Sequence, residues 1–569
     1  MNQCAGGVCV PPDRAMPIIR RDPHSLESVD CNPTIPQASK RHLHAVAVAA
    51  PAQASTPVCV EDAKTGVITC DGALSNGAKY RTMVPSNYGG TFFFWQHGVR
   101  PSYPYPGYVV PTGVEQMSPT SVNHKVSTVK PMLQLGYGIA AYDCSSNGLH
   151  GWNTADCVEM LNELVTITKK RISITKTVVY GSSMAGAILT PYIEKYPNGA
   201  DAVGILAGVS PSIANTLKSG CDFLYIFSVF FDPTIKGCTV MGTKGVPGHM
   251  AVLGDFAKVG ALLTKWSVDY GANPIAYPAP LVGSGIPQRS ALLLAGLIAG
   301  LPTKSAHMDG ISTNATLIPE QSINATVAIL ENTQELLGTA YFGGQGVSEI
   351  VGAGFYDNTK TDFGALLSDA DLGRFNLGLS GDDAINAMLA TLAAYPRVTG
   401  VPDAMAKAAA LDKSKFDTTK PVVLLSNEAD RLVLPGNTPL YVNKDRAVYE
   451  SSLAAWQKKY AAATTSSEVS ALLKSKPVWN TVAMYALTPE IYTKFTATGA
   501  PDLTAPVAIS GVGHESFTKE QLMTWVRVLA SSAKTGKVPS QTVLNTILPK
   551  VPYLNTDPDY QPAELKYQD

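Results

Sequence analysis

The sequence TVVYGSSMAG at residues 177–186 decides the fold class of this chain. Its first four residues are β-branched or aromatic, which is typical of a buried strand. A cluster of small residues follows, and the chain from Ser183 to about Tyr196 is predicted to be a helix. A strand that turns this sharply into a helix is the setting in which a serine is exposed on a strained turn.

The two adjacent serines differ in their neighbours. A turn this tight requires small residues two positions before and two positions after the exposed serine. For Ser183 these are Gly181 and Ala185, whereas for Ser182 they would be a tyrosine and a methionine, which would clash. Ser183 is therefore the predicted nucleophile. Small residues could also serve only to pack a helix against a strand, so the prediction depends on finding a base and an acid.

The predicted base is His514. It follows a predicted strand, Pro506–Ser510, and the glycines at 511 and 513 permit a loop that turns the imidazole back over the sheet. Most other histidines precede the nucleophile, in the N-terminal arm or in loops. His249 and His307 fall in a predicted insertion, where structural roles are expected.

The acid is expected just beyond the preceding strand, Pro421–Leu425. Asp430 lies a few residues past that strand and is followed by an apolar stretch and a proline. Glu428 is the competing carboxylate, and a carboxylate here could also be a surface charge paired with Arg431. Asp430 is favoured, which gives the chain order serine, aspartate, histidine.

Two backbone N–H groups are needed to hold an oxyanion. The first is expected at Met184, directly after the nucleophile. The second is expected from the loop after the aromatic strand Thr91–Trp95, with Val99 N–H as the first choice and Gly98 N–H as the second. His97 is interpreted as a buried histidine that braces this loop.

Strand and helix signals alternate on both sides of a long interruption, which predicts an α/β fold with a mostly parallel sheet flanked by helices. The last helix is predicted to begin at a capping box formed by Thr518. The predicted units are an extended N-terminal arm (1–55), the first part of the core (56–210), a large inserted, mainly helical cap or lid (211–420) and the second part of the core (421–569), which includes a helical insertion at about 444–498 and a C-terminal tail.

These motifs, in their order along the chain, resemble the α/β-hydrolase superfamily: His97-Gly98, Gly181–Ala185, Asp430 and His514. The resemblance covers about residues 78–208 and 420–536, and the segment 513–518 is similar to that of large secreted bacterial α/β-hydrolases. It implies an α/β-hydrolase fold and acyl transfer through a serine, a histidine and an aspartate, with no metal or organic cofactor. The tannase and feruloyl-esterase branch joins its triad through cysteines next to the serine and the histidine. Ser182 and Glu515 stand in those places, which argues against that branch.

The composition narrows the range of partners. Hydrophobic residues make up 45% of the chain, enough for a sizeable core, and charged residues only 16%, against about 25% in an average soluble domain. With a formal net charge of −1, neither nucleic acid nor an anionic membrane surface is an expected partner. No run approaches the ~20 apolar residues that a transmembrane helix needs, and the sequence does not indicate an oligomeric state.

The nine cysteines form four closely spaced pairs and leave Cys31 over: Cys4–Cys9, Cys59–Cys70, Cys144–Cys157 and Cys221–Cys238. The second pair flanks a predicted hairpin turn, where opposite positions can meet disulfide geometry. Local disulfides are predicted, with reduced core thiols as the alternative, and no cysteine has zinc-ligand spacing. Disulfides would indicate an oxidising compartment, so a secreted or periplasmic location is expected.

The expected function is hydrolysis of a carboxylic ester, with a lipid-like, aryl or polyester substrate. The predicted cap offers apolar side chains for the substrate site: Phe227, Phe230, Phe231, Leu292–Leu294, Leu297 and Ile298. Two alternatives stay open. One is an exported serine aminopeptidase of the same fold, for which a carboxylate cluster could be Asp369, Asp371, Asp382 and Asp383. The other is a non-catalytic binding protein built on a hydrolase scaffold.

Overall fold

The computed structural model describes residues 55–560 and 562, apart from 106–107, 112, 122–125, 146–148, 210–211, 269–277, 311–317, 369–380, 498–500, 548–549 and 561. Apart from Ser55, the predicted arm lies outside the described residues, and so do Cys31 and the predicted Cys4–Cys9 pair.

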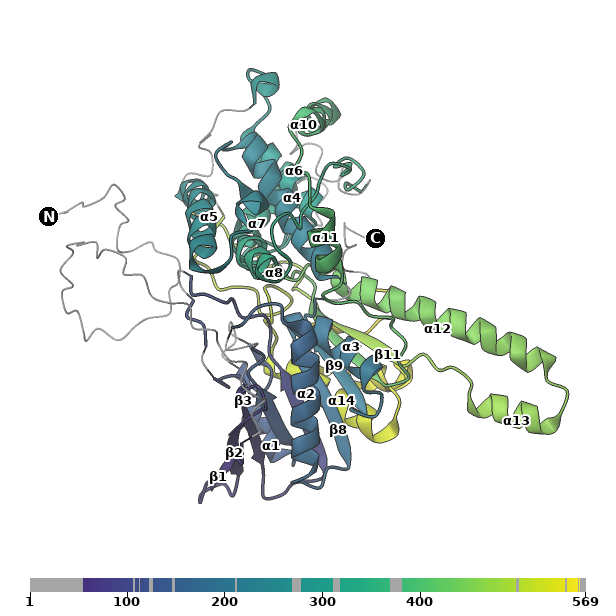
Figure 1. Cartoon of the computed structure of the whole chain (residues 1–569). Helices are drawn as coiled ribbons and strands as arrows, with labels where there is room; N and C mark the ends of the chain where they lie inside the picture. The colour runs from purple at the N-terminus through teal and green to yellow at the C-terminus, as the bar shows by residue number, and fades with distance from the viewer. Residues whose placement is uncertain are drawn as a thin grey trace, which may run out of the picture.

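A ten-stranded sheet occupies the lower part of the view in Figure 1, with its strands in the order β1-β2-β3-β7-β4-β8-β9-β10-β11-β12. Its strands are β1 (Val58–Glu61), β2 (Ile68–Ala73), β3 (Lys79–Val84), β4 (Thr91–Gln96), β7 (Gly138–Tyr142), β8 (Lys176–Ser182), β9 (Ala202–Leu206), β10 (Val422–Asn427), β11 (Thr481–Ala486) and β12 (Leu554–Asn555). The six strands from β7 to β11 run parallel, and antiparallel strands close both edges. A separate hairpin consists of β5 (Thr120–Ser121) and β6 (Val126–Ser127). The predicted α/β class with a mostly parallel sheet is confirmed.

Helices cover both faces of the sheet, which is why β4 is buried along its whole length. Phe92 and Phe94 point to the face packed against α2 (Thr154–Lys169) and α3 (Gly186–Lys195). The alternate residues of β4 point to the other face, which packs against α1 (Val129–Gln134) and α14 (Lys519–Thr535). Helix α14 begins at the capping box that the sequence predicts. The short α15 (Gln541–Ile547) follows it.

A group of helices between β9 and β10, here called the helical insertion (residues 213–409), stands at one end of the sheet (Figure 1). Its elements are α4 (Ile213–Phe230), η2 (Gly237–Val240), α5 (Gly245–Val268), η3 (Ala279–Leu281), α6 (Gln288–Ala299), α7 (Ile318–Gly338), the π-helical η5 (Thr339–Gly343), α8 (Gly344–Val351), α10 (Asp382–Ala394) and α11 (Pro402–Ala409). It has a hydrophobic core of its own, built around α4 and α6.

Two expectations for the C-terminal part are wrong. Helices α12 (Asn437–Ala462) and α13 (Ser466–Lys474) end well before residue 498, and β11 occupies part of the predicted helical insertion at 444–498. Conversely, Pro506–Ser510 is not a strand, and Val507 and Ile509 are 40% and 56% exposed. Strand β11 is rich in β-branched and aromatic residues and pairs on both sides, whereas a proline at 506 lacks the N–H that a ladder needs.

Three of the predicted cysteine pairs are disulfides in the structure. They join β1 to β2 (Cys59–Cys70), the end of β7 to α2 (Cys144–Cys157) and α4 to η2 (Cys221–Cys238). Among the described helices, none is both long enough and apolar enough to cross a bilayer. The disulfides are consistent with a location outside the cytoplasm.

Candidate active site

Ser183 lies at the junction of β8 and η1 (Ser183–Ala185), which leads directly into α3. Its φ of 54° is in the left-handed region, a strained conformation for a serine. A Cβ on Gly181 would lie 2.3 Å from the Gln96 carbonyl oxygen and 2.5 Å from the Ala185 Cβ. The turn at Ser183 therefore requires small residues at positions 181 and 185.

Asp430 and His514 are in direct contact. His514 Nδ1 lies 2.9 Å from Asp430 Oδ2, and the other carboxylate oxygen accepts hydrogen bonds from Leu432 N–H and Val433 N–H at 2.9 and 3.0 Å. Asp430 is 1% exposed. With both oxygens engaged, the carboxylate is held in one orientation and can fix that of the imidazole.

The loops that carry this acid and this base are joined by their backbones. Ala429 N–H donates to Gly511 O, and Gly513 N–H donates back to Ala429 O, at 2.8 and 3.0 Å. The Asn427 side chain adds a 2.7 Å hydrogen bond to Gly513 O. Gly511 and Gly513 both have a φ of 80°, which glycine adopts without strain. The loop after β11 is thus held beside the end of β10.

Glu428, the competing carboxylate, points elsewhere. One oxygen pairs with Lys304 Nζ at 2.7 Å, and the other accepts from Thr488 N–H and Thr488 Oγ1 at 2.7 and 2.9 Å. Its partners give it a structural role, and the structure places Asp430, not Glu428, against His514.

Both predicted oxyanion donors lie close to Ser183. Met184 is the next residue in the turn, and Val99 lines the same cavity as Ser183. A Cβ on Gly98 would lie only 3.0 Å from the Ser183 Cβ, so the 98–99 loop passes directly beside the nucleophile. In the described part of the chain, the N–H groups of Met184 and Val99 donate to no other protein group.

His97 braces this loop. Cys144 N–H donates to its Nε2 at 2.9 Å, so Nδ1 carries the proton and donates to Gly98 O at 2.6 Å. Burial, with a contribution from Arg100, lowers the pKa of His97 to about 3. With Nε2 already accepting the Cys144 N–H and with so low a pKa, His97 is a poor proton acceptor, which fits the predicted role of bracing the loop.

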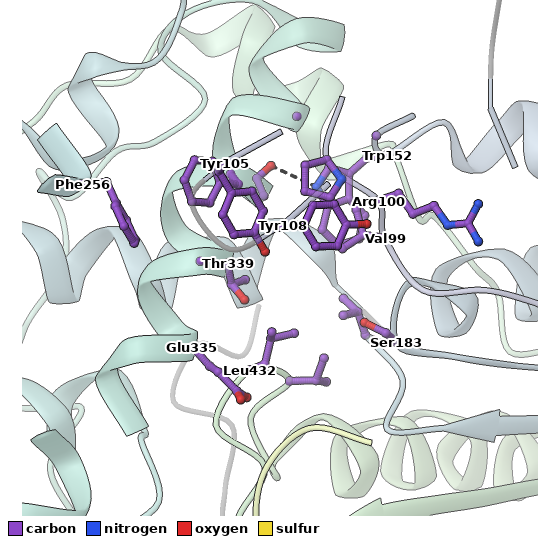
Figure 2. A pocket seen from close by; sticks show the side chains of 18 of the residues that line it. Val99, Arg100, Tyr105, Tyr108, Trp152, Ser183, Phe256, Glu335, Thr339 and Leu432 are labelled. Atoms are coloured by element: carbon purple, nitrogen blue, oxygen red, sulfur yellow. Dashed lines mark hydrogen bonds between the residues drawn. The ribbon is translucent and has the colours of Figure 1, made fainter. Parts of the chain in front are cut away.

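A cavity of about 230 Å³ opens beside Ser183 (Figure 2). Its aromatic wall consists of Tyr105, Tyr108 and Phe342: the Tyr105 ring stacks on Phe342 at 4.2 Å and on Tyr108 at 5.0 Å between ring centroids. Trp152 and Phe256 extend the apolar lining. The cavity can hold a small apolar or planar group next to the nucleophile.

Glu335 is the carboxylate in the cavity lining. Its Oε1 accepts a 2.6 Å hydrogen bond from Arg431 Nη2, which joins α7 to the loop of the predicted acid. Glu335 was not predicted from the sequence, and Arg431 was predicted only as a possible partner of a carboxylate in its own segment. Long-range pairs of this kind leave no local signal in the sequence.

The prediction of which apolar side chains of the insertion line the substrate site is wrong. Phe227, Leu294 and the other predicted side chains belong to the interior of the helical insertion and do not line the cavity. Of the expected carboxylate cluster, Asp382 and Asp383 occupy the first turn of α10, and the other two lie outside the described residues.

A strained serine between a parallel strand and a helix, followed along the chain by an aspartate after β10 and a histidine after β11, decides the fold. The chain has the α/β-hydrolase fold. No protein-family model and no curated protein matches the sequence.

Solved structures with weak similarity to this α/β-hydrolase fold include several esterases. An esterase from Aspergillus oryzae is 13% identical with a TM-score of 0.33, over 83% of this chain and 81% of that one. Feruloyl esterase B from Aspergillus oryzae is 12% identical with a TM-score of 0.32, over 86% of each chain. Tannin acyl hydrolase from Aspergillus niger is 13% identical with a TM-score of 0.32, over 86% and 83%. Similarities this low do not assign a function to this chain.

Proposed function

We propose that this protein is a serine hydrolase that cleaves carboxylic esters through an acyl-enzyme on Ser183. The observation that carries the proposal is the strained serine at the edge of a cavity, together with a buried aspartate that contacts a histidine on the neighbouring loop. Ser183 attacks the ester carbonyl while His514 takes the serine proton and Asp430 orients the imidazole. His514 then returns the proton to the leaving alcohol, and water releases the acyl group by the same steps.

Met184 N–H and Val99 N–H are the proposed oxyanion donors. Neither N–H donates to an acceptor among the described residues, which supports this role because a preorganised donor must be available when the charge develops. No cofactor takes part in the proposed steps.

The cavity favours an ester over a peptide. Its lining is mainly apolar and aromatic, which suits an aryl or short lipid-like group or a polyester unit. Glu335 is the observation in favour of the aminopeptidase alternative, since a carboxylate could bind a substrate ammonium group. Its charge is already compensated by Arg431, which supports ester hydrolysis. The disulfides support a secreted or periplasmic location.

The test has two parts. A fluorophosphonate probe is expected to label Ser183, with labelling lost in Ser183→Ala and kept in Ser182→Ala. Absence of labelling in the native protein would favour the non-catalytic scaffold. p-Nitrophenyl esters graded by acyl length and aryl character are then compared with aminoacyl p-nitroanilides, and faster cleavage of the anilides would overturn the ester assignment.

A further inference from the structure

His514 lies between two carboxyl groups. Asp430 contacts its Nδ1, and Glu515 Oε1 lies 3.5 Å from its Nε2. Nε2 is the nitrogen that must take the proton from Ser183, yet the structure has no hydrogen bond between His514 Nε2 and Ser183 Oγ, both of which it describes. Glu515 therefore occupies the reactive edge of the imidazole.

The backbone directs Glu515 into this position. Its φ of 54° is in the left-handed region, as for Ser183, so both residues hold conformations that disfavour a side chain. The preceding Gly513 has a φ of 80° and allows the reversal. Strained conformations of non-glycine residues persist where the surrounding contacts demand them.

The Glu515 carboxyl also contacts the segment that carries the nucleophile. A Cβ on Gly98 would lie 3.5 Å from Glu515 Oε1 and 3.0 Å from the Ser183 Cβ, so Gly98 is closely flanked by both residues. The Ser182 hydroxyl is buried, and no described residue partners it in good hydrogen-bonding geometry. It lies close enough to the carboxyl to lower the Glu515 pKa. The Glu515 carboxyl thus lies between His514 and the end of β8, which leads into Ser183.

The charges in this cluster act on one another. Burial raises the pKa of Glu515, while His514 and Ser182 oppose that rise and Asp430 adds to it. For His514, burial lowers the pKa, but Asp430, Glu515 and Glu335 together outweigh burial and raise it to about 9. The imidazolium form of His514 is therefore stabilised from both of its nitrogens.

We propose that Glu515 is a second positioning carboxylate for His514, which holds the Nε2 edge of the imidazolium and so sets the pH range in which His514 acts as a base. This inference rests on the proposed function. In acylation the Ser183 Oγ–carbonyl carbon bond forms, the carbonyl electron pair moves to oxygen, and the Ser183 proton moves to Nε2. An ionised Glu515 stabilises the cation that this transfer creates. It also keeps the resting base protonated at neutral pH, which restricts activity to alkaline conditions.

The experiment is the rate of Ser183 labelling by a fluorophosphonate between pH 5 and pH 10.5, which needs no known substrate. In the native protein, half-maximal labelling is expected near pH 9. In Glu515→Gln, which keeps the shape but removes the charge, we expect this midpoint to fall by about one to three pH units. Labelling then becomes faster than native at pH 7. Above pH 9 it becomes slower, by about tenfold, because a weaker base takes the serine proton less readily.

Glu520→Gln is the matched control, since Glu520 is exposed in the first turn of α14, five residues away, and its removal should leave the midpoint in place. Glu515→Asp keeps the charge but withdraws it from Nε2, so an intermediate midpoint is expected. Near-UV circular dichroism verifies that each variant is folded. An unchanged midpoint in folded Glu515→Gln, or a uniform loss of rate at every pH, would overturn the proposal. Absence of labelling in the native protein at every pH would instead refute the proposed function.

Discussion

Replacing Asp430 by asparagine tests which carboxylate is the acid. Oδ1 of Asp430 accepts two backbone N–H groups, from Leu432 and Val433, so in Asp430→Asn the amide oxygen must take that position. The amide NH₂ then faces His514 Nδ1, where the native carboxylate oxygen lies at 2.9 Å. An NH₂ donor requires Nδ1 to be unprotonated, which moves the imidazole proton to Nε2. His514 would then present a donor to Ser183 and could not take its proton.

The expected loss in kcat/KM is about 10⁴-fold, the size of effect that a wrong tautomer has in serine hydrolases. The assay is hydrolysis of the best p-nitrophenyl ester, together with the rate of fluorophosphonate labelling. Glu428→Gln is the matched control, because it changes a carboxylate two residues away whose partners are Lys304 and Thr488. It should lower the free energy of unfolding by about 1–3 kcal/mol while the active site stays intact.

The two variants together discriminate the assignments. If Asp430→Asn kept more than about a tenth of the native kcat/KM, the reasoning from the two N–H donors would be wrong. If Glu428→Gln caused the larger loss, the acid would be Glu428, and the loops after β10 and β11 would have to rearrange in solution.

Three further predictions follow from the geometry. Burial lowers the His514 pKa, but Asp430, Glu515 and Glu335 outweigh burial and raise it to about 9, so kcat/KM should rise from pH 7 to about 9. The contribution of this shift to the free energy of unfolding is present below pH 6.5 and is lost as the pH rises through 9. A kcat/KM that does not change between pH 7 and pH 9 would contradict the shift. Gly181→Ala should lower the free energy of unfolding by about 1–3 kcal/mol in a denaturant titration, because the new Cβ would clash with the Gln96 backbone. Gly254→Ala on α5 is the control: the space around Gly254 is open, so this variant should not destabilise the protein. Tyr105→Ala should remove a stacking interaction worth about 0.5–1.5 kcal/mol and so raise KM for aryl esters about two- to tenfold relative to acetyl esters. An equal change in KM for both kinds of ester would show that the aromatic wall of the cavity does not contact the aryl ring of the substrate.

The predictable part of this protein is the part determined by neighbours in sequence. The strand-to-helix turn at Ser183 depends on Gly181 and Ala185, and the steric conflict at position 181 is visible from residue sizes alone. The disulfide between β1 and β2 depends in the same way on a short hairpin. Local sterics and short spacing predict both features without knowledge of the rest of the fold.

Features determined by distant contacts were predicted less well. Strand β11 is a strand because it pairs with β10 and β12, and six residues beside a long helical stretch do not reveal those partners. The contact of Glu515 with His514 Nε2 depends on a left-handed backbone at a non-glycine residue, which sequence patterns do not predict. The acid–base pair is an intermediate case: its order along the chain was predictable, and its hydrogen bond depends on loops joined by backbone contacts.

The proposed catalytic residues are positioned by local strand ends, whereas the cavity wall depends on contacts between distant segments. Ser183, Asp430 and His514 lie directly after β8 or on the loops that follow β10 and β11, so their relative positions are fixed by the sheet. The cavity wall is assembled from separate segments, with Tyr105 from a loop of the core and Phe342 from the π-helical η5 of the insertion. Substitutions in η5 can therefore reshape the substrate site without moving the strand ends. We infer that substitutions in the helical insertion and in the core loop that carries Tyr105 change the substrate range, while the proposed proton transfer depends on the residues at the strand ends.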